Sequence, residues 1–593
     1  MDSKRIQRRT GMEYALFLIL FLGTLFINAV LCSYLVEIIV RQSRQITIVW
    51  YMDKRAFFWA EVMVVFCVSL FLSMCTNRPA HALRITNLLI FCPAVIYSYK
   101  WQFRGEPLLL TDFGQIREAA ELVPNFKMTI PSILLSAFVI LIVLIPIPYM
   151  GQRLEIRGKR RAICSAASAV FFLGSLFYAA NIDFSIPNQY TDLYNKAGFL
   201  RGLWETRPQK QLEKPAEYER TQVLSLLEGF GAETVSSQTC KPDVFFIMSE
   251  SLFDLYRLEK LDMTMDPLAS LKKLQEEYSG ANFLAPNFGG GTFYSEYEVL
   301  TGYRTSDTPN VLFNDKDVIT EGMDTLVTVL KEAGYTATAV HPNSGRYYNR
   351  AYNYRRMGFD RMQFAGDGLK PITEKIGFYP KDKPLLKQVL DDYDGIKAEN
   401  QPLFYHIVTY QNHGPYASDY DRRDVLVMNR SGDEKKNAEN YSNACIEHME
   451  AVAYFLQALS ERKRPAVVVL WGDHAPNTSS FGLQPGDGAN AALYYQTPIL
   501  IWNNYGADFK LEEDSIAAYR LGAVVLNLLG IHSDAYFNWL AENDEPDLLT
   551  SRHLLEIEGR FMEDDDRYKE ISDQLYLLHY DRLKGEKYWK EAN

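Results

Sequence analysis

The chain has 593 residues, 48% of them hydrophobic, and a formal net charge of -11 at pH 7. This length exceeds what one hydrophobic core usually supports, so at least two folding units are expected. The acidic charge and the lack of a basic stripe exclude a nucleic-acid-binding protein. Because the apolar residues are concentrated near the N-terminus, we expect a membrane part followed by a polar part.

Five apolar segments in the first third of the chain are suited to crossing a membrane. They are Phe17–Val40, Phe57–Met74, Ile85–Tyr99, Ile130–Met150 and Ile163–Ala180. A bilayer core needs about 20 apolar residues, and the third segment is short and contains Pro93. Since further segments follow the first one, it is interpreted as an anchor that is not cleaved. Residues 1–181 are thus predicted to form a transmembrane anchor of about five helices.

The distribution of basic residues predicts how the anchor is oriented. The N-terminus carries Lys4, Arg5, Arg8 and Arg9, and the loop before the fifth segment carries Arg153, Arg157, Lys159, Arg160 and Arg161. Such clusters usually lie in the cytoplasm, although basic residues after the first segment weaken the bias. With five crossings, everything after Ala180 is expected outside. Residues 107–124 would also lie outside, where Ile116, Ala119, Ala120 and Val123 predict an amphipathic helix on the membrane.

After residue 181 the composition of the chain and the pattern of its apolar residues change. Residues 182–240 are polar and are interpreted as a linker with some helix around Tyr218–Leu227. Over residues 241–545, short apolar runs alternate with amphipathic helical stretches. The runs are Val244–Met248, Ala337–Val340, Leu403–Val408, Ala466–Leu470 and Ile499–Trp502. This alternation predicts an α/β domain with a largely parallel central sheet. Residues 546–593 form an acidic tail, helical in part, without a catalytic pattern.

Polar residues stand at the ends of four of these predicted strands. Glu250 follows the first run, His341 follows the second, His413 comes shortly after the third, and Asp473-His474 comes shortly after the fourth. In parallel sheets ligands bind at the carboxyl ends of the strands, so these side chains are expected to meet there. Taken singly, each has an ordinary alternative: Glu250 could cap a helix, His413 could be a loop histidine and Asp473 could begin a turn.

A divalent cation fits this set of residues. Glu250, Asp473 and His474 supply two carboxylates and an imidazole, a donor set compatible with Mn²⁺, Mg²⁺ or Zn²⁺. Three glycines, 289–291, precede Thr292 and a helical stretch, Phe293–Leu300. Glycines allow close approach of a ligand, and a helix N-terminus favours phosphate oxygens. Thr292 is therefore the candidate nucleophile, activated by the metal; a plain N-cap is its ordinary alternative.

Together these motifs resemble the lipoteichoic acid synthase and phosphoglycerol transferase family, within the alkaline phosphatase and sulfatase superfamily. The matching segments are Asp243–Glu250, Gly289–Thr292 with Ser295-Glu296, Trp471–His474, Asn412-His413 and His341–Arg350. With the predicted anchor, the resemblance covers nearly the whole chain. The formylglycine signature of true sulfatases (Cys or Ser, then x-Pro-x-Arg) is absent from the sequence of the external domain, which disfavours a sulfatase.

The resemblance implies roles for individual residues. The implied ligands of Mn²⁺ or a related cation are Glu250, Thr292, Asp473 and His474. The implied binding residues for a phosphoglycerol head are His341, Tyr348, Arg350 and His413. Thr292 would be the nucleophile, assisted by Arg350 and His413. The better-known synthases have tryptophan where this chain has Tyr348, so the preference for head group or acceptor could differ.

The expected activity is transfer of glycerol phosphate from phosphatidylglycerol, through a covalent intermediate on Thr292, to a cell-envelope acceptor. The enzyme would lie in the inner membrane of a bacterium with its catalytic domain outside the cytoplasm. A teichoic polymer, a periplasmic glucan and a glycolipid primer are all open as acceptors. Hydrolysis, phosphoethanolamine transfer and an inactive sensor are the alternatives. The sequence also leaves open the metal, the oligomeric state, cleavage of the linker and a Cys240–Cys445 disulfide.

Overall fold

The structure is a computed structural model of the chain and describes most of its residues. The described ranges are 11–104, 108–115, 132–154, 156, 158–182, 190–207, 212–231, 241–308, 318–396, 401–416, 420–483, 491–532, 534–542, 556–557, 560–561 and 566–593. Predictions for the basic N-terminus, for the amphipathic helix within 107–124 beyond residue 115 and for Cys240 lie outside these ranges. Cys445 is a buried free thiol.

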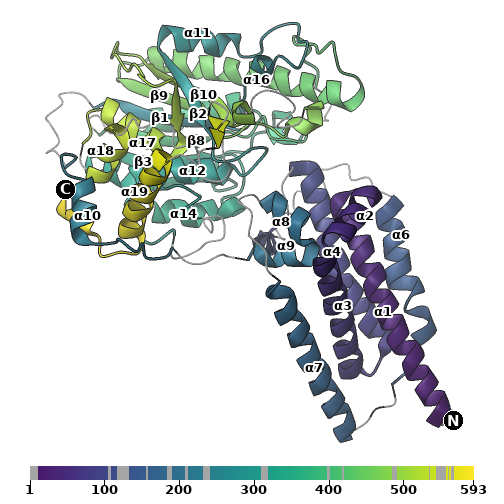
Figure 1. Cartoon of the computed structure of the whole chain (residues 1–593). Coiled ribbons are helices and arrows are strands. Elements are labelled where there is room, and N and C mark those ends of the chain that lie inside the picture. Colours follow the sequence, from purple (N-terminus) through teal and green to yellow (C-terminus); the bar gives the residue numbers. More distant parts are fainter. Residues whose placement is uncertain are drawn as a thin grey trace. The chain divides into compact units, whose positions relative to one another are not determined.

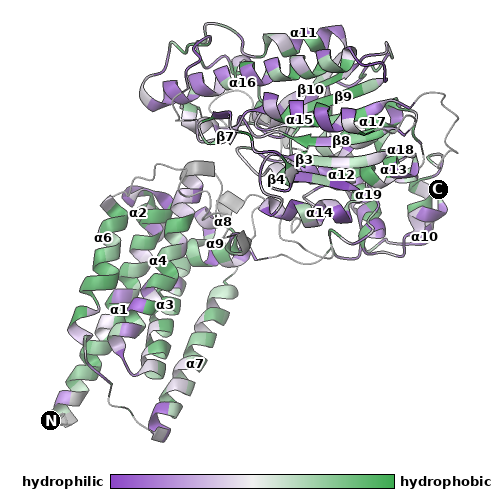
Figure 2. Cartoon of the chain, turned by 180° about the vertical axis from the view of Figure 1, so that it is seen from behind, coloured by the Kyte–Doolittle hydropathy of each residue, from purple (hydrophilic) through white to green (hydrophobic). Residues whose placement is uncertain are grey.

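The chain divides into two compact units, and the first, which ends at Arg207, is built from apolar helices (Figure 1). Five helical segments of the described chain are long and apolar enough to cross a membrane. They lie in α1 (Gly11–Arg41), α3 (Arg55–Thr76), α4 (Pro79–Arg104), the run of α6, η3 and η4 (Ser132–Tyr149) and α7 (Gly158–Ala180). Figure 2 shows them as predominantly hydrophobic. The five predicted apolar helices are thus confirmed, and α4 continues through Pro93.

Buried polar contacts help to hold this first unit together. Asn28 of α1 and Asn87 of α4 exchange amide hydrogen bonds of 3.0 and 2.8 Å. Such bonds are favoured between apolar helices because a lone amide would have no partner there. Part of the predicted linker also packs in this unit, as α8 (Tyr190–Ala197) and α9 (Phe199–Glu205). The backbone N–H of Phe199 donates to Glu37 Oε1 at 2.6 Å, which ties α9 to α1.

The second unit is centred on a nine-stranded sheet in the order β11-β2-β10-β9-β1-β8-β3-β4-β5. The strands are β1 Asp243–Ser249, β2 Ser279–Leu284, β3 Thr336–His341, β4 Arg361–Ala365, β5 Gly368–Leu369, β8 Leu403–Val408, β9 Ala466–Gly472, β10 Gln496–Asn503 and β11 Ser515–Ala517. From β9 to β5 all neighbours are parallel, while β10 runs antiparallel to both of its neighbours. The predicted α/β fold with a largely parallel sheet is confirmed.

Helices cover both faces of this sheet because successive strand residues point to opposite sides. On β1, Phe245 and Ile247 pack into one core with α11 (Ala269–Glu277), α15 (Asp382–Gly395) and α16 (Gly432–Ser460). Phe246 and Met248 pack into the other core. That core contains α12 (Thr292–Thr301), α13 (Leu326–Glu332), α17 (Ala518–Leu528) and α18 (Ala535–Glu542). Burial on both faces explains why the central strands read as continuous apolar runs.

The end of the chain belongs to the second core. Within the predicted acidic tail, α19 (Asp566–Leu583) is followed by a short turn of helix, η11 (Tyr588–Glu591). Leu575 and Leu578 are fully buried, and the Arg582 guanidinium lies 3.9 Å from the centre of the Trp589 ring. Tyr218, which precedes α10 (Arg220–Leu226), donates a hydrogen bond to Asp581. The described residues 566–593 of the tail therefore pack within this unit.

Candidate active site at the carboxyl edge of the sheet

The carboxyl ends of four adjacent parallel strands, β9, β1, β8 and β3, meet at one edge of the sheet. The register keeps the ends level, since Met248 of β1 pairs with both Val408 of β8 and Trp471 of β9. The side chains at or beyond these ends are Asp473 and His474, Glu250, His413, and His341. Four separate parts of the sequence are thereby brought to the edge at which parallel sheets bind ligands.

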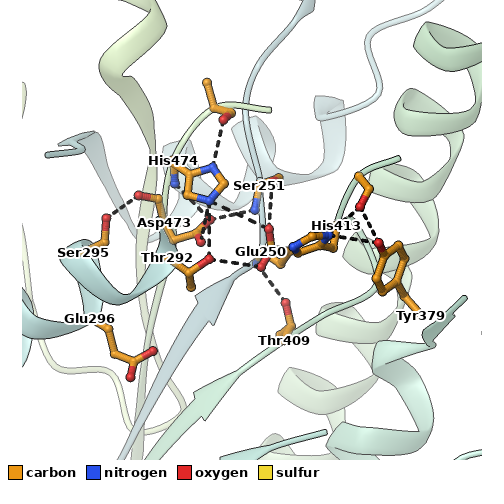
Figure 3. Close-up of polar contacts among 12 residues, drawn as sticks. Glu250, Ser251, Thr292, Ser295, Glu296, Tyr379, Thr409, His413, Asp473 and His474 are labelled. Carbon is orange, nitrogen blue, oxygen red and sulfur yellow. Dashed lines mark hydrogen bonds and ion pairs between the residues drawn. The ribbon is translucent and has the colours of Figure 1, made fainter. Parts of the chain in front are cut away.

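Glu250, Asp473 and His474 form a buried group that could hold a metal ion, with one ligand atom from each lying within 4.8 Å of the others. His474 Nε2 is 3.2 Å from Asp473 Oδ2 and 3.9 Å from Glu250 Oε1 (Figure 3). The Nδ1 of His474 lies 2.8 Å from the Ala475 carbonyl, to which it donates. The lone pair of a neutral ring is then left on Nε2, facing the two carboxylates.

The electrostatics of this group also fit a divalent cation. Burial and the neighbouring Asp473 carboxylate raise the pKa of Glu250 well above its usual range. Two carboxylates and an imidazole lone pair that face one another repel unless a positive charge lies between them. Oxygen and imidazole donors suit Mn²⁺, Mg²⁺ and Zn²⁺ alike. The residues present therefore fit the metal that the sequence predicts.

Thr292 is the first residue of α12 and lies beside this group. Its Oγ1 is 3.4 Å from both Glu250 Oε2 and His474 Nε2 (Figure 3). The N-cap position belongs to Gly291, so the threonine does not act as a plain N-cap. Gly291 has a φ of +82°, and a Cβ there would lie 2.7 Å from Asn287 Nδ2. Only glycine fits this close turn, which brings the threonine hydroxyl against the metal-binding group.

Neighbouring hydrogen bonds orient the candidate ligands. The N–H of Glu250 donates to Thr409 Oγ1 at 3.0 Å, and the hydroxyl of Ser251 donates to Glu250 Oε1 at 2.9 Å. The N–H of Ser251 donates to Asp473 Oδ1 at 2.7 Å, and Ser295 Oγ donates to the Asp473 carbonyl. Ser251 has a φ of +50°, a strained conformation for a residue with a side chain. Such strain is common at functional sites, and the sequence contains no local signal for these roles beyond the adjacency of Ser251 to Glu250.

His341 ends β3 with one ring nitrogen unused. Its Nδ1 lies 3.1 Å from the Val408 carbonyl, whereas its buried Nε2 has no partner among the described residues. Burial, reinforced by the Arg350 charge, lowers the pKa of His341 well below its usual range. The neutral ring donates through Nδ1, so Nε2 can accept a hydrogen bond from a hydroxyl or an amide N–H. This agrees with a substrate-binding role.

Arg350 begins α14 (Arg350–Arg356) and is held in a buried ion pair. Its guanidinium lies 3.0 Å from Glu296 Oε2 and 5.1 Å from the centre of the Tyr348 ring. The Tyr348 ring stacks on Phe293, the residue after Thr292, with the ring centres 6.0 Å apart. Tyr348 also has a positive φ of 53°, again a strained conformation. Arg350 and Tyr348 thus lie next to the start of α12, and Glu296 fixes the arginine.

His413 is half-buried and lies next to Tyr379, a residue without a sequence-predicted role. Its Nδ1 is 2.6 Å from the Gly414 carbonyl and 3.1 Å from the Tyr379 hydroxyl, which itself donates to Gly414 (Figure 3). Tyr379 comes from the short strand β7 (Tyr379–Pro380), which pairs with β6 (Lys375–Ile376). This hairpin is separated from His413 in sequence, so only the fold reveals the contact.

Comparison with known proteins finds similarity in sequence and in fold. Residues 242–531 match the Sulfatase family model. A relative from Rhizobium meliloti (strain 1021), named "Putative cyclic beta-1,2-glucan modification protein", is 27% identical over 95% of this chain and 92% of its own length.

Two solved structures show the same fold. The phosphoglycerol transferase GacH of Streptococcus pyogenes, solved with sn-glycerol-1-phosphate, has a TM-score of 0.51 at 21% identity, covering 64% of this chain and 97% of that one. The phosphoethanolamine transferase EptA of Neisseria meningitidis, an integral membrane protein, has a TM-score of 0.55 at 15% identity, covering 88% of this chain and 98% of that one. Residues 242–531 therefore match a sulfatase domain and share the fold of these two enzymes, in a chain that also carries five apolar helices.

Proposed function

We propose that this protein is a membrane-anchored, metal-dependent phosphoglycerol transferase. It takes glycerol phosphate from phosphatidylglycerol, carries it on Thr292 and passes it to a hydroxyl of a cell-envelope acceptor. The observation that supports this most directly is the position of the Thr292 hydroxyl, 3.4 Å from both Glu250 and His474 at the start of a helix. A hydroxyl so placed can attack a phosphodiester whose oxygens face the helix N-terminus.

The proposed ligands of the cation are Glu250, Thr292, Asp473 and His474, and Mn²⁺ is the proposed ion, with Mg²⁺ or Zn²⁺ as alternatives. When bound, a divalent cation lowers the pKa of a coordinated hydroxyl and offsets charge on phosphate oxygens. In the first step the Thr292 hydroxyl gives its proton to water as its oxygen bonds to phosphorus, and the bond to diacylglycerol breaks. His413 is proposed to supply the proton that diacylglycerol takes away. In the second step the oxygen of an acceptor hydroxyl bonds to phosphorus and its proton returns to His413, while the Thr292 oxygen leaves and takes up a proton from water.

A glycerol head group agrees better with the surrounding residues than ethanolamine does. The unpartnered Nε2 of His341 can accept a hydrogen bond from a glycerol hydroxyl. An ethanolamine ammonium would instead need a carboxylate or an aromatic face. Nearby, the Glu296 carboxylate and the Tyr348 ring already face the Arg350 guanidinium. Arg350, which Glu296 holds in place, can counter the charge of the phosphoryl group.

The proposed acceptor is a glucan hydroxyl. The support is the name of the Rhizobium relative, whose similarity runs through almost the whole of both chains, including the apolar helices. We further propose that the five helices cross the inner membrane of a bacterium and leave the sulfatase domain outside the cytoplasm. The basic residues near the span ends support an N-terminus inside the cell. Donor lipid, glucan and active site would then lie on the same side of the membrane.

The test is release of diacylglycerol from labelled phosphatidylglycerol by the purified full-length protein with Mn²⁺, with and without cyclic glucan. We expect metal-dependent release, and label on the glucan when it is present. Label appearing only as free glycerol phosphate would instead identify a hydrolase. Turnover of phosphatidylethanolamine in place of phosphatidylglycerol would overturn the head-group argument. A folded protein that binds no Mn²⁺ would indicate an inactive domain.

A further inference from the structure

Three buried side chains form a hydrogen-bonded chain behind the metal-binding group. His448 of α16 has its Nδ1 2.8 Å from Asp382 Oδ2 and its Nε2 2.9 Å from Ser249 Oγ. All three residues are 0% exposed. The Asp382 carboxylate can only accept, so Nδ1 donates to it, and Nε2 shares a second hydrogen bond with the Ser249 hydroxyl. The chain of contacts is Ser249–His448–Asp382.

The serine of this hydrogen-bonded network lies directly beside the candidate metal ligands. Ser249 is the last residue of β1, directly before Glu250, and its carbonyl accepts the N–H of Asp473 at 3.3 Å. Any shift of Ser249 therefore moves two of the candidate ligands. Contacts behind ligands commonly set metal affinity, because they fix the direction in which each ligand points.

The aspartate end lies under the segment that carries His413. Asp382 Oδ1 accepts the N–H groups of Tyr410 at 3.2 Å and Gln411 at 3.3 Å. The N–H of Asp382 donates in return to Gln411 Oε1 at 3.0 Å. One oxygen of the Asp382 carboxylate thus helps to hold the segment between β8 and His413, and the other oxygen accepts from His448.

The order Ser-His-Asp is also that of a nucleophilic triad, but the environment excludes that role here. Ser249 is wholly buried in the sheet, and it pairs with Gly472 of β9. A nucleophile must reach a substrate, and this hydroxyl faces His448 of the covering helix instead. A fully satisfied buried network serves to fix the geometry of its neighbours.

We propose that His448 is a positioning residue that joins the two halves of the active site, the metal-binding half through Ser249 and the head-group half through Asp382. The identity of the two halves rests on the proposed function. Each ring nitrogen then controls a different property. Nε2 sets the affinity for the metal, and Nδ1 sets the affinity for the phosphoglycerol head.

Two substitutions of His448 test the roles of its two ring nitrogens separately. The amide nitrogen of asparagine stands as many bonds from Cβ as Nδ1 does and can donate to Asp382. The amide oxygen of glutamine stands as many bonds from Cβ as Nε2 does and can accept from the Ser249 hydroxyl. His448→Asn therefore keeps the contact to Asp382 and loses that to Ser249, whereas His448→Gln does the reverse. Ser249→Ala removes the serine contact without changing the helix, and it should reproduce the effect of His448→Asn.

The experiment measures binding to the full-length protein in detergent, with Mn²⁺ alone and then with sn-glycerol-1-phosphate at saturating Mn²⁺. For His448→Asn and Ser249→Ala we expect Mn²⁺ affinity to fall by about 10- to 100-fold while glycerol phosphate affinity stays within about twofold. For His448→Gln we expect the opposite pattern. Protection of the buried Cys445 thiol from alkylation, on the same helix, verifies that each variant is folded.

Equal losses of both affinities in both histidine variants, or no loss in either, would overturn the proposal. If the wild-type protein binds Mn²⁺ but not glycerol phosphate, the proposed function fails instead. The Mn²⁺ measurement still decides the metal-binding link in that case. Weaker Mn²⁺ binding in His448→Asn than in His448→Gln would support that link, and equal binding would refute it.

Discussion

Replacing Glu296 by glutamine should destabilise the second unit by about 3–5 kcal/mol. Glu296 and Arg350 are 0% and 1% exposed, and their closest nitrogen and oxygen lie 3.0 Å apart. At an effective dielectric constant of about 20, two unit charges at this distance attract by roughly 5 kcal/mol. Glutamine removes that attraction and leaves the guanidinium charge buried without a counter-charge. The unfolded fraction should therefore rise by about 150- to 5,000-fold.

The free thiol of Cys445 provides an assay for this unit within the intact chain. It is fully buried, and burial raises its pKa to about 12, so it should react with an alkylating reagent only after the unit opens. Alkylation over a series of urea concentrations, followed by mass spectrometry of the peptide that contains Cys445, gives the free energy of opening. The cysteines of the apolar helices are read from other peptides, so they do not interfere.

Two further variants make this measurement decisive. Adding Arg350→Met to Glu296→Gln should recover most of the loss, because no uncompensated charge remains. Glu298→Gln is a matched control on the same helix. Glu298 is also buried, but it accepts from the N–H and hydroxyl of Thr305, which glutamine can retain, so a loss of about 1–2 kcal/mol is expected. A Glu296→Gln protein within about 1 kcal/mol of the wild type, or a double variant no more stable than the single one, would refute the reasoning.

Four other predictions concern catalysis, metal, pH and topology. Thr292→Ala should reduce diacylglycerol release by about 10³-fold or more, whereas Thr292→Ser should retain part of it; equal loss in both would contradict a nucleophilic hydroxyl. Glu250→Gln should weaken Mn²⁺ binding by at least about 10-fold in electron paramagnetic resonance titrations, unlike Glu447→Gln, which alters an ion-paired carboxylate of α16. Burial lowers the pKa of His406 to about 3, so the folded protein keeps it neutral while the unfolded chain takes up a proton below about pH 6.5. The free energy of unfolding should therefore be highest above about pH 6.5 and fall by up to about 1.4 kcal/mol per pH unit below it. In thermal unfolding over a pH series, His406→Leu should make this pH dependence weaker. Protease added to right-side-out vesicles of the inner membrane should remove the second unit; complete protection would reverse the proposed orientation.

The residues at the strand ends show how much of the candidate site can be predicted from local sequence. Glu250, His341, His413 and the Asp473-His474 pair could be assigned to one edge because parallel strands place their carboxyl ends together whatever their order. Their separations, and the 3.4 Å approach of Thr292, depend on β1 lying between β8 and β9. That order results from crossover connections, and no residue along the strands encodes it locally.

By itself the sequence determined the five apolar helices, the alternation of strands and helices, and the types of residue at the strand ends. These features depend on segment length, on periodicity and on immediate neighbours, which are all local. Only the tertiary structure decided that Glu296 holds Arg350, that Tyr379 contacts His413, and that His448 lies between Ser249 and Asp382. The physical reason is that a buried polar side chain must find its partner in space, and the folded core chooses that partner regardless of distance along the chain.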